Sequence, residues 1–383
     1  MRDFRTAISL HSHTCHSKEC ADFIPLYFQR IPVLNRMIAS SMRRYEERTG
    51  VAIDFRRIYW TPPVLPATVF ASETSQIEEK LDLAALVSIT DHDTIAAPLS
   101  LRQQPDSTSV PISVEWSVPF GDNTFHLGVH NLPPARSDEI MKDLSRFTAE
   151  PAEERLPELL ELLGRSAESL LVLNHPYFDF ARQGAAKHRA SLREFLSRYR
   201  PWIHALELGG MRPWRESQEV LRLAEECDLP IVAGGDRHGC CPNGVLNLSH
   251  SESWGEFVEE VRRRRHNEIL VLPPCEDPVS LRELQIVADV SRYYPDYPYG
   301  HRQFTDRIFV DLEGYSWHPL SFYWSGGMPL WLRPVFGGLT ALGSHFTRPV
   351  LRRFLCLFGD SDLATWPTRA GYQTGGFSIQ REA

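Results

Sequence analysis

The stretch that decides the fold is TAISLHSHTCH, residues 6–16, near the start of the chain. Its apolar residues 6–10 predict a buried strand, and the histidines at positions 11, 13 and 16 follow directly. Because side chains on a strand alternate between two faces, His11 and His13 are expected to point to the same side. Two neutral imidazoles held side by side are a typical pair of metal ligands, and a solvated or hydrogen-bonded pair is the alternative.

The composition is that of an ordinary globular protein, with 42% hydrophobic and 23% charged residues among 383. This length is enough for one large core and an accessory region. The formal net charge of -8 argues against a general nucleic-acid-binding surface, whereas a small anionic substrate held by a metal is compatible with it. The cysteines, seven in number and without a Cys-x-x-Cys pair, follow no secretory signal and predict a reduced, cytoplasmic chain.

Short apolar, β-branched runs alternate with segments of helical spacing. The runs occupy residues 6–10, 86–90, 110–116, 125–130, 169–174, 205–208, 230–233 and 269–272, and the helical segments include residues 77–84, 152–163, 214–227 and 253–265. This alternation predicts an α/β protein built from parallel β/α units. Seven or eight such units over about 270 residues suggest a closed or nearly closed barrel.

Two regions stand outside this alternation. Residues from about 20 to 75 hold a predicted helix stopped by Gly50 and then a proline-rich run, and we interpret them as a lid inserted after the first strand. Residues 274–383 are rich in aromatic residues and proline, and we interpret them as an accessory region appended to a barrel of residues 1–273.

No apolar run in the chain reaches the roughly 18 to 20 residues that span a bilayer. Residues 334–358 interleave apolar side chains with arginines, which predicts an amphipathic helix packed on the main domain or on a second copy in an oligomer. Contact of this region with a membrane surface is the alternative.

The predicted strands end in ionisable side chains. In a β/α barrel the C-terminal ends of the strands converge on one mouth. Burying so many ionisable groups in one mouth costs several kcal/mol unless they are paired or bind metal. In strand order the residues are His11 and His13; Asp91, His92 and Asp93; Glu115; His126 and His130; His175; Glu207; and Asp236 and His238. The sequence therefore predicts a metal centre.

The motifs LHSHT, ITDHDT, VEWS with HLGVH, NHPYF and GGDRHG, in this order, resemble those of the PHP (polymerase and histidinol phosphatase) family. The resemblance covers residues 4–273. It implies a distorted (β/α)7 barrel of TIM-like type that holds two or three divalent ions of manganese, iron or zinc. It also implies hydrolysis of a phosphoester, in a small phosphorylated metabolite or nucleotide, by metal-bound hydroxide.

The same resemblance implies a set of ligands, with two positions left open. His16 is a rival to Glu19, and either or both of His126 and His130 can serve. Where the family has Asp-Leu-His, this chain has Ser9, Leu10 and His11, and so lacks a carboxylate that would orient the first histidine pair. The full set of implied metal ligands is His11, His13, Glu19, His92, Glu115, His126, His130, His175, Asp236 and His238.

Proton transfer and phosphate binding need further groups. Asp91 and His238 are the candidates for moving protons. Arg237 is a candidate bidentate donor to a substrate phosphate, and a surface ion pair is the alternative for it. Arg212, Arg215 and Lys18 are further candidate cations, each with a solvated surface charge as the alternative.

Two other classes of function are compatible with these residues. One is a metal hydrolase of similar barrel architecture that attacks an amide or a lactone, which would not need arginines near the mouth. The other is a non-catalytic metal-binding module whose tail recruits a partner or a membrane. The complete ligand set argues against the second, because a site without chemistry has no physical need for it.

Overall fold

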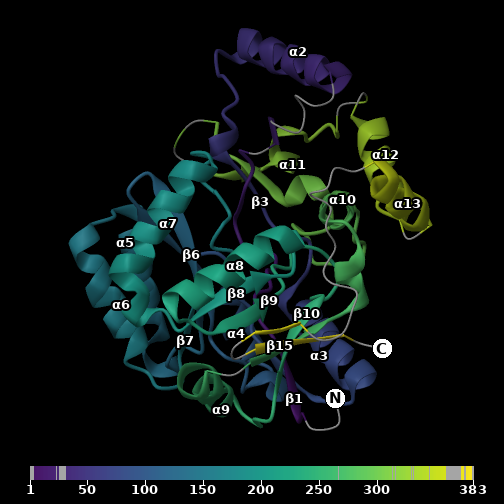
Figure 1. Ribbon diagram of the computed structural model, residues 1–383. Helices are drawn as coiled ribbons and strands as arrows, with labels where there is room; N and C mark the ends of the chain where they lie inside the picture. Colours follow the sequence, from purple (N-terminus) through teal and green to yellow (C-terminus); the bar gives the residue numbers. More distant parts are fainter. Residues whose placement is uncertain are drawn as a thin grey trace.

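The computed structural model describes residues 4–22, 24–25, 32–265, 267–312, 314, 316–328, 330, 332–344, 346–358, 372–374 and 377–381. Their strands form three sheets, of which the two larger are mixed and the third is antiparallel (Figure 1). The first sheet has the order β14 (Tyr372–Thr374), β15 (Phe377–Arg381), β11 (Asn267–Val271), β10 (Val245–Ser249), β1 (Thr6–Ser9) and β4 (Ala84–Val87). The second has the order β5 (Val114–Phe120), β6 (Asn123–His130), β7 (Leu170–Leu173), β8 (Ala205–Gly209) and β9 (Ile231–Gly234).

The expected β/α units are parallel only in part. Strands β7, β8 and β9 run parallel, as do β1 and β4, but β5, β6 and β7 pair antiparallel, and so do β1, β10 and β11. The hairpin of β5 and β6 turns at Gly121, whose φ of 56° suits a tight reversal. Strand β10 was not among the predicted strands, and Asn247 interrupts its apolar pattern.

The described strands do not form one closed barrel. The two larger sheets approach each other through isolated bridges, from Ser12 to Arg237 and from His92 to Glu115. These bridges lie where β1 and β4 have just ended, next to Arg237 after β9 and Glu115 in β5. The segments that carry the predicted ligands therefore meet where the two sheets come together.

Helices α5, α6 and α7 lie together on one side of the molecule, and α12 and α13 lie on the other side, next to α10 (Figure 1). Helix α6 shows why these segments are helical, since its leucines 156, 159, 160 and 163 are buried at the spacing of one helix face. The helices are α2 (Pro32–Thr49), α3 (Pro66–Leu81), α4 (Ala96–Leu101), α5 (Ser137–Ala149), α6 (Leu156–Gly164), α7 (Ala185–Tyr199), α8 (Trp214–Cys227), α9 (Trp254–Glu259), α10 (Val279–Ser291), α11 (Leu320–Tyr323), α12 (Arg333–Leu342) and α13 (Arg348–Phe358).

The predicted insertion and the C-terminal region share the third sheet. Its order is β13 (His318–Pro319), β12 (Ile308–Val310), β3 (Ile58–Trp60) and β2 (Glu19–Cys20), so two strands come from each region. Strand β15 also joins the first sheet by pairing with β11. Helix α2 of the insertion lies apart from all three sheets (Figure 1). The division of the chain at residue 273 stays a prediction.

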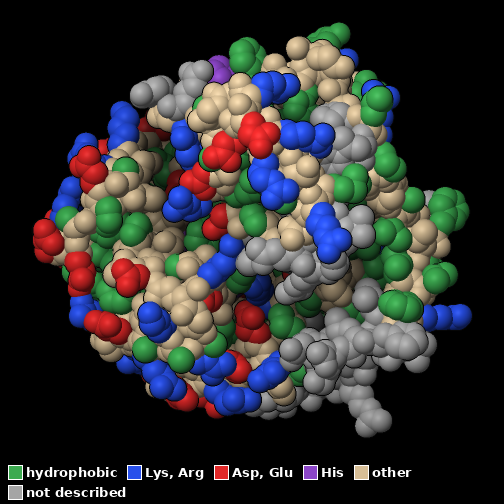
Figure 2. All heavy atoms as spheres, turned by 90° about the horizontal axis from the view of Figure 1, so that it is seen from above, with side chains coloured by type: hydrophobic (Ala, Val, Ile, Leu, Met, Phe, Trp, Pro, Cys, Tyr) green, Lys and Arg blue, Asp and Glu red, His purple; other side chains and the backbone are tan. Residues whose placement is uncertain are grey.

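The C-terminal helices leave apolar side chains on the surface. Figure 2 shows hydrophobic side chains gathered along the margin where α12 and α13 lie, and the exposed residues there include Phe346, Val350 and Phe354. Nothing in the described residues identifies what covers them. Within the described parts of the chain, no helix has both the length and the apolar character needed to cross a membrane.

Candidate metal centre

The first histidine pair meets, although not for the reason that the sequence suggested. Strand β1 ends at Ser9, and His11 has a left-handed backbone with φ of 64°. Strand alternation therefore does not aim these side chains. The tight turn brings the Nε2 atoms of His11 and His13 to 3.1 Å from each other instead. Asp236 and His175 also have positive φ, at 52° and 27°, so three predicted ligands sit on strained turns after strands.

Glu115 lies at the centre of the site and is fully buried. It stands near the start of β5, not at the end of a strand as predicted. The nearest ring nitrogens of five histidines lie within 3.4 Å of its two carboxylate oxygens. The distances are 3.0 Å for His11, 3.2 Å for His13, 3.4 Å for His92, 3.4 Å for His126 and 3.0 Å for His175.

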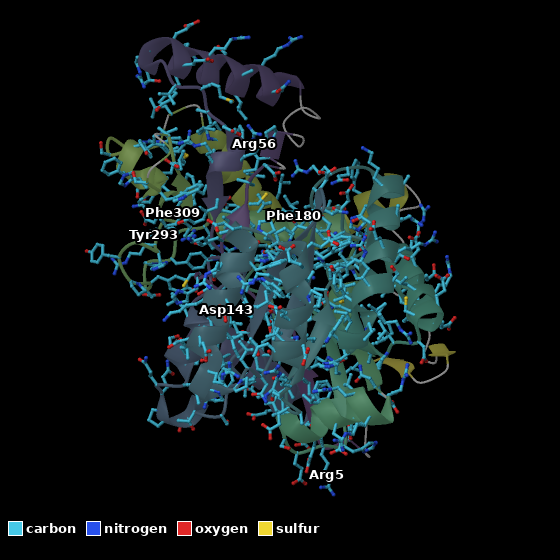
Figure 3. All side chains as sticks on the ribbon, turned by 90° about the vertical axis from the view of Figure 1, so that its left-hand side faces the viewer. Arg5, Arg56, Asp143, Phe180, Tyr293 and Phe309 are labelled. Atoms are coloured by element: carbon cyan, nitrogen blue, oxygen red, sulfur yellow. The ribbon has the colours of Figure 1, made fainter. Side chains whose placement is uncertain are left out.

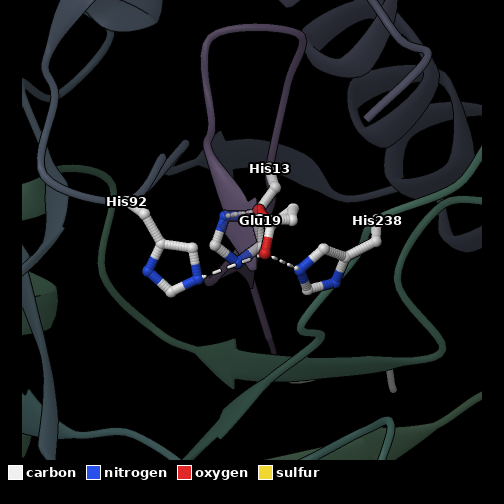
Figure 4. Close-up of side chains that lie close together, drawn as sticks. All are labelled: His13, Glu19, His92 and His238. Atoms are coloured by element: carbon white, nitrogen blue, oxygen red, sulfur yellow. Dashed lines mark ion pairs between the residues drawn. The ribbon is translucent and has the colours of Figure 1, made fainter. Parts of the chain in front are cut away.

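A second carboxylate, Glu19, lies between His92 and the sixth histidine of the cluster, His238. Its Oε2 lies 3.4 Å from Nε2 of His92 and 3.1 Å from Nε2 of His238, and Figure 4 shows it between these two rings. Strand pairing holds it there, because Glu19 of β2 lies opposite Trp60 of β3. The rival ligand His16 is exposed, so the structure brings Glu19 into the cluster and leaves His16 outside it.

The donor atoms form three overlapping groups that can hold metal ions. In each group the ligand atoms all lie within 4.8 Å of one another. The groups are His13, Glu19, His92 and His238; His11, His13 and Glu115; and His92, Glu115 and His126. His13, His92 and Glu115 each belong to two groups, so the three groups lie side by side, as neighbouring ions require.

Two predicted ligands border these groups. His175 lies 3.0 Å from Glu115, and its backbone N–H donates to Glu207 Oε2 at 2.8 Å. Asp236 Oδ1 lies 3.5 Å from Nε2 of His11 and 3.4 Å from Nδ1 of His238. The structure therefore brings both residues to the same cluster, at its edge.

The cluster is electrostatically coupled throughout. Burial by itself raises the pKa of Glu115, but His11, His92 and His126 hold this pKa well below its usual range. Burial by itself lowers the pKa of His92, but Glu115 and Glu19 raise it to about 10. In the same way the pKa of His238 rises to about 9, despite burial, because of Glu19 and Asp236. Buried carboxylates in this number demand positive charge nearby.

The residues fit divalent metal ions. The buried Nδ1 of His92 has no hydrogen-bond partner within the described part of the chain, although it lies 3.4 Å from Glu115. An unpaired buried nitrogen facing a carboxylate is a position that a cation would satisfy. The mixture of imidazole and carboxylate donors suits manganese, iron or zinc.

Glu207 orients the first histidine, a role that the sequence did not assign. Its Oε1 lies 2.5 Å from Nδ1 of His11, which directs Nε2 of that ring toward Glu115. A Cβ at Gly234 would lie 1.6 Å from the same oxygen, so only glycine leaves room for this contact. Glu207 thus supplies an orienting carboxylate where position 9 holds Ser9, whose hydroxyl donates to Glu73. The sequence did place Glu207 at a predicted strand end, in ALELGG, and this position was the feature that could have indicated its role.

His130 lies away from the cluster. Strand β6 runs antiparallel to β7, so His130 pairs with Leu170 at the start of β7, whereas His126 lies beside the residues that follow β7. Nδ1 of His130 lies 2.8 Å from the hydroxyl of Ser88, and burial lowers the pKa of this histidine to about 3. The phenyl ring of Phe180 lies 5.1 Å from the ring of His126, and Figure 3 shows Phe180 near the middle of the molecule, far from Arg5 at its lower end.

Asp91 holds a loop. One carboxylate oxygen accepts the backbone N–H of Thr14 at 2.5 Å, and the other accepts its hydroxyl at 2.7 Å. Asp91 is fully buried. These contacts fix the chain directly after His13 and leave proton transfer by Asp91 without geometric support.

Arg237 forms a buried ion pair, where a surface ion pair was the expected alternative to phosphate binding. Its guanidinium pairs with buried Glu73 at 2.7 Å and donates to Ser72 and to two backbone carbonyls. The ion pair is therefore in the interior, not on the surface. Because these donors already have partners, the structure gives no support to a contact between Arg237 and a substrate phosphate.

Arg212, one of the candidate cations for phosphate binding, interacts electrostatically with a residue of the cluster, Asp236. Its guanidinium carbon lies 4.2 Å from the centre of the Phe178 ring, and its Nε donates to Glu216 at 2.9 Å. Burial lowers its pKa, but Glu216 and Asp236 together raise it, so Arg212 lies within electrostatic reach of the cluster. Lys18 and Arg215 are exposed, and Lys18 lies over the ring of Tyr59 at 5.4 Å.

No protein-family model matches the sequence, and no curated protein matches it. Remote similarities to solved structures exist. An amidohydrolase from Chromobacterium violaceum with bound sulfate and no metal is 15% identical, with a TM-score of 0.33 over 46% of this chain and 83% of its own.

Two other solved structures are similarly distant. A candidate metal-dependent phosphoesterase from Bifidobacterium adolescentis is 15% identical, with a TM-score of 0.31 over 52% of this chain and 91% of its own. PsfC from Pseudomonas syringae is 16% identical, with a TM-score of 0.35 over 54% of this chain and 87% of its own. The candidate centre therefore rests on its own geometry.

Proposed function

We propose that this protein is a metal-dependent phosphoesterase of the PHP type, which hydrolyses a small phosphorylated metabolite or nucleotide. The observation that carries the proposal is the position of Glu115, a buried carboxylate with the ring nitrogens of five histidines within 3.4 Å. Glu19 and Asp236 add two further carboxylates to the same cluster. Such a concentration of ligands is unnecessary for folding and is typical of a multinuclear hydrolytic site.

The residues that would hold two or three divalent ions are His11, His13, Glu19, His92, Glu115, His126, His175, Asp236 and His238. Manganese, iron or zinc in this position supplies Lewis acidity, which lowers the pKa of a water molecule and neutralises charge on phosphoryl oxygens. No protein nucleophile is part of the proposal.

Hydrogen bonds from neighbouring side chains hold the ligand residues in position. Glu207 holds the ring of His11 through Nδ1, and Asp91 anchors Thr14 next to His13. Ser17 donates to Glu19 at 2.5 Å and accepts the backbone N–H of His92 at 3.1 Å, so one hydroxyl links two ligand-bearing segments. This support keeps the donor atoms in one geometry during turnover.

A phosphoesterase also needs a cation for the non-bridging oxygens, and we assign this role to Arg212. It stacks on Phe178, and Asp236 contributes to its raised pKa. Both groups considered for proton transfer are engaged, Asp91 with Thr14 and His238 as a ligand, so the proposal assigns neither of them this role. An amide or lactone hydrolase would not need Arg212 at this position.

The test is phosphate release from the manganese-loaded protein with sugar phosphates, nucleotides, histidinol phosphate and phosphodiesters, beside a panel of amides and lactones. Asp236→Asn keeps the shape of a cluster residue and removes its charge. Arg222→Gln is the matched control, because Arg222 is exposed on α8. We expect phosphate release by the wild type and by Arg222→Gln, and a loss of about 100-fold or more in Asp236→Asn.

Three results would contradict the proposal. Hydrolysis of only amides or lactones would establish the other class of metal hydrolase. Equal phosphate release by Asp236→Asn would place the activity elsewhere. Metal binding without hydrolysis of any compound would favour a non-catalytic binding module.

A further inference from the structure

A cavity of about 70 Å³ lies directly beside the candidate metal centre, and His238 forms part of its wall. One side consists of Gly210 and Met211 after β8 and of the loop 237–244 after β9. The other side is helix α10, with Arg348 at the start of α13. The C-terminal region therefore completes a space that the strand-end loops alone would leave open.

Most charges around this cavity already have partners. Arg237 pairs with Glu73, and Nε of Arg348 donates to Asp277 at 2.6 Å. The carboxylate of Asp289 accepts the backbone N–H of Cys240 at 2.8 Å and the side-chain amide of Gln285 at 2.9 Å. Asp289 also lies 3.8 Å from Nη1 of Arg292, so each of these charged groups has a partner of opposite charge.

Arg282 is different from the other charged residues of the wall. Its Nη1 donates to the carbonyl of Gly210, whereas its buried Nε has no hydrogen-bond partner within the described residues. No described carboxylate lies within ion-pair distance of its guanidinium, as one does for Arg237 and Arg348. Burial lowers the pKa of Arg282, and the more distant charges of Asp277 and Glu283 offset this effect only in part.

A half-buried cation whose Nε is buried and unpaired, in a cavity that borders the candidate metal centre, is a site for an anion. The volume of about 70 Å³ is small and is of a size that suits a carboxylate or a phosphate group. An anionic group in this cavity would belong to a substrate that extends past His238 to the cluster.

Resting on the phosphoesterase function proposed above, we propose that Arg282 binds a second anionic group of the substrate. The substrate is then a small molecule with a phosphoester at one end and a carboxylate or a second phosphate at the other. The C-terminal region supplies the residue that selects it.

Binding of two non-hydrolysable phosphonates tests this proposal without turnover. Ethylphosphonate carries one anionic group, and 3-phosphonopropionate adds a carboxylate to the same carbon chain. We expect titration calorimetry on the manganese-loaded full chain to show tighter binding of 3-phosphonopropionate by about tenfold or more.

Three variants make the result specific. Arg282→Gln should remove the preference and leave the affinity for ethylphosphonate unchanged, since the cluster itself binds the phosphonate. Arg282→Lys keeps the charge without the bidentate geometry, so part of the preference should remain, and this variant replaces the first if that one does not fold. Arg222→Gln should retain the full preference, because Arg222 is exposed on α8.

The failures are distinguishable. If the wild type binds both phosphonates equally, or if Arg282→Gln keeps the preference, the assignment of Arg282 is overturned while the proposed phosphoesterase function stands. If neither phosphonate binds and no phosphoester is hydrolysed, both proposals are overturned together.

Discussion

The Nδ1 atom of His11 lies 2.5 Å from Oε1 of Glu207, across 196 positions of sequence. This contact joins the turn after β1 to β8 and fixes which nitrogen of His11 faces the cluster. Its oxygen occupies space that a side chain at position 234 would take. The geometry of the candidate metal centre thus depends on a residue that donates nothing to a metal.

Replacing Glu207 with Gln should weaken metal binding by about 10–100-fold, because an amide can stabilise the wrong tautomer of His11. The measurement is a competition titration of the full chain against a chelator of known affinity. Glu226→Gln, at an exposed position of α8, should bind metal like the wild type. Unchanged affinity in Glu207→Gln would show that His11 needs no orientation from this carboxylate.

The choice between Glu19 and His16 can be made by counting bound ions. Glu19 faces His92 and His238, whereas His16 is exposed. Glu19→Ala should therefore lower the number of manganese ions bound per chain, measured by elemental analysis after gel filtration, and His16→Ala should not. The reverse pattern would contradict the position of β2.

Arg237 and Glu73 should behave as a buried ion pair. Their side chains are 2% and 0% exposed, and each single change, Arg237→Met or Glu73→Gln, should lower the free energy of unfolding by about 3–5 kcal/mol. The double variant should cost less than the sum, as judged by urea unfolding. An Arg237→Met protein with unchanged stability and a raised KM would instead identify a substrate contact.

His204 should make stability depend on pH. Its Nδ1 accepts the backbone N–H of Leu171 at 2.9 Å, and burial, with a smaller effect of Arg262, lowers its pKa to about 3. The unfolded chain, with a pKa near 6.5, binds more protons below that pH, so stability is complete above about 6.5 and falls as the pH drops toward 3.

The variant His204→Asn keeps a hydrogen-bond acceptor that does not titrate. Between pH 7 and pH 5 it should lose about 1–2 kcal/mol less of its unfolding free energy than the wild type. Chemical unfolding at the two pH values provides the measurement. Identical losses in the two proteins would show that His204 is protonated without cost in the folded state.

The residues that the sequence placed after parallel strands do meet in space, and their role as ligands stays a prediction. The turns after β1, β4, β7 and β9 carry His11 and His13, His92, His175, and Asp236 and His238, all of which reach the cluster. An apolar run and the polar residue that follows it form a local pattern, so the sequence alone is enough to predict them. Helix α8 is likewise legible, because its helical spacing over residues 214–227 depends on nearby residues alone.

The same reasoning could not separate His126 from His130, because both follow the pattern of a strand. Only the antiparallel pairing of β6 with β7 places His126 beside His175 and His130 at the opposite end. Direction depends on which distant strand is the partner, and no local periodicity encodes that choice.

By itself, then, the sequence determined the alternation of strands and helices, and the ionisable residues available for a metal centre. The tertiary structure decided which of them meet. Glu19 enters through a sheet shared with β3 and β12, Glu207 reaches His11, and Arg237 turns inward to Glu73. These contacts join segments far apart in the chain, and they form because buried charges must find partners when the sheets close over them.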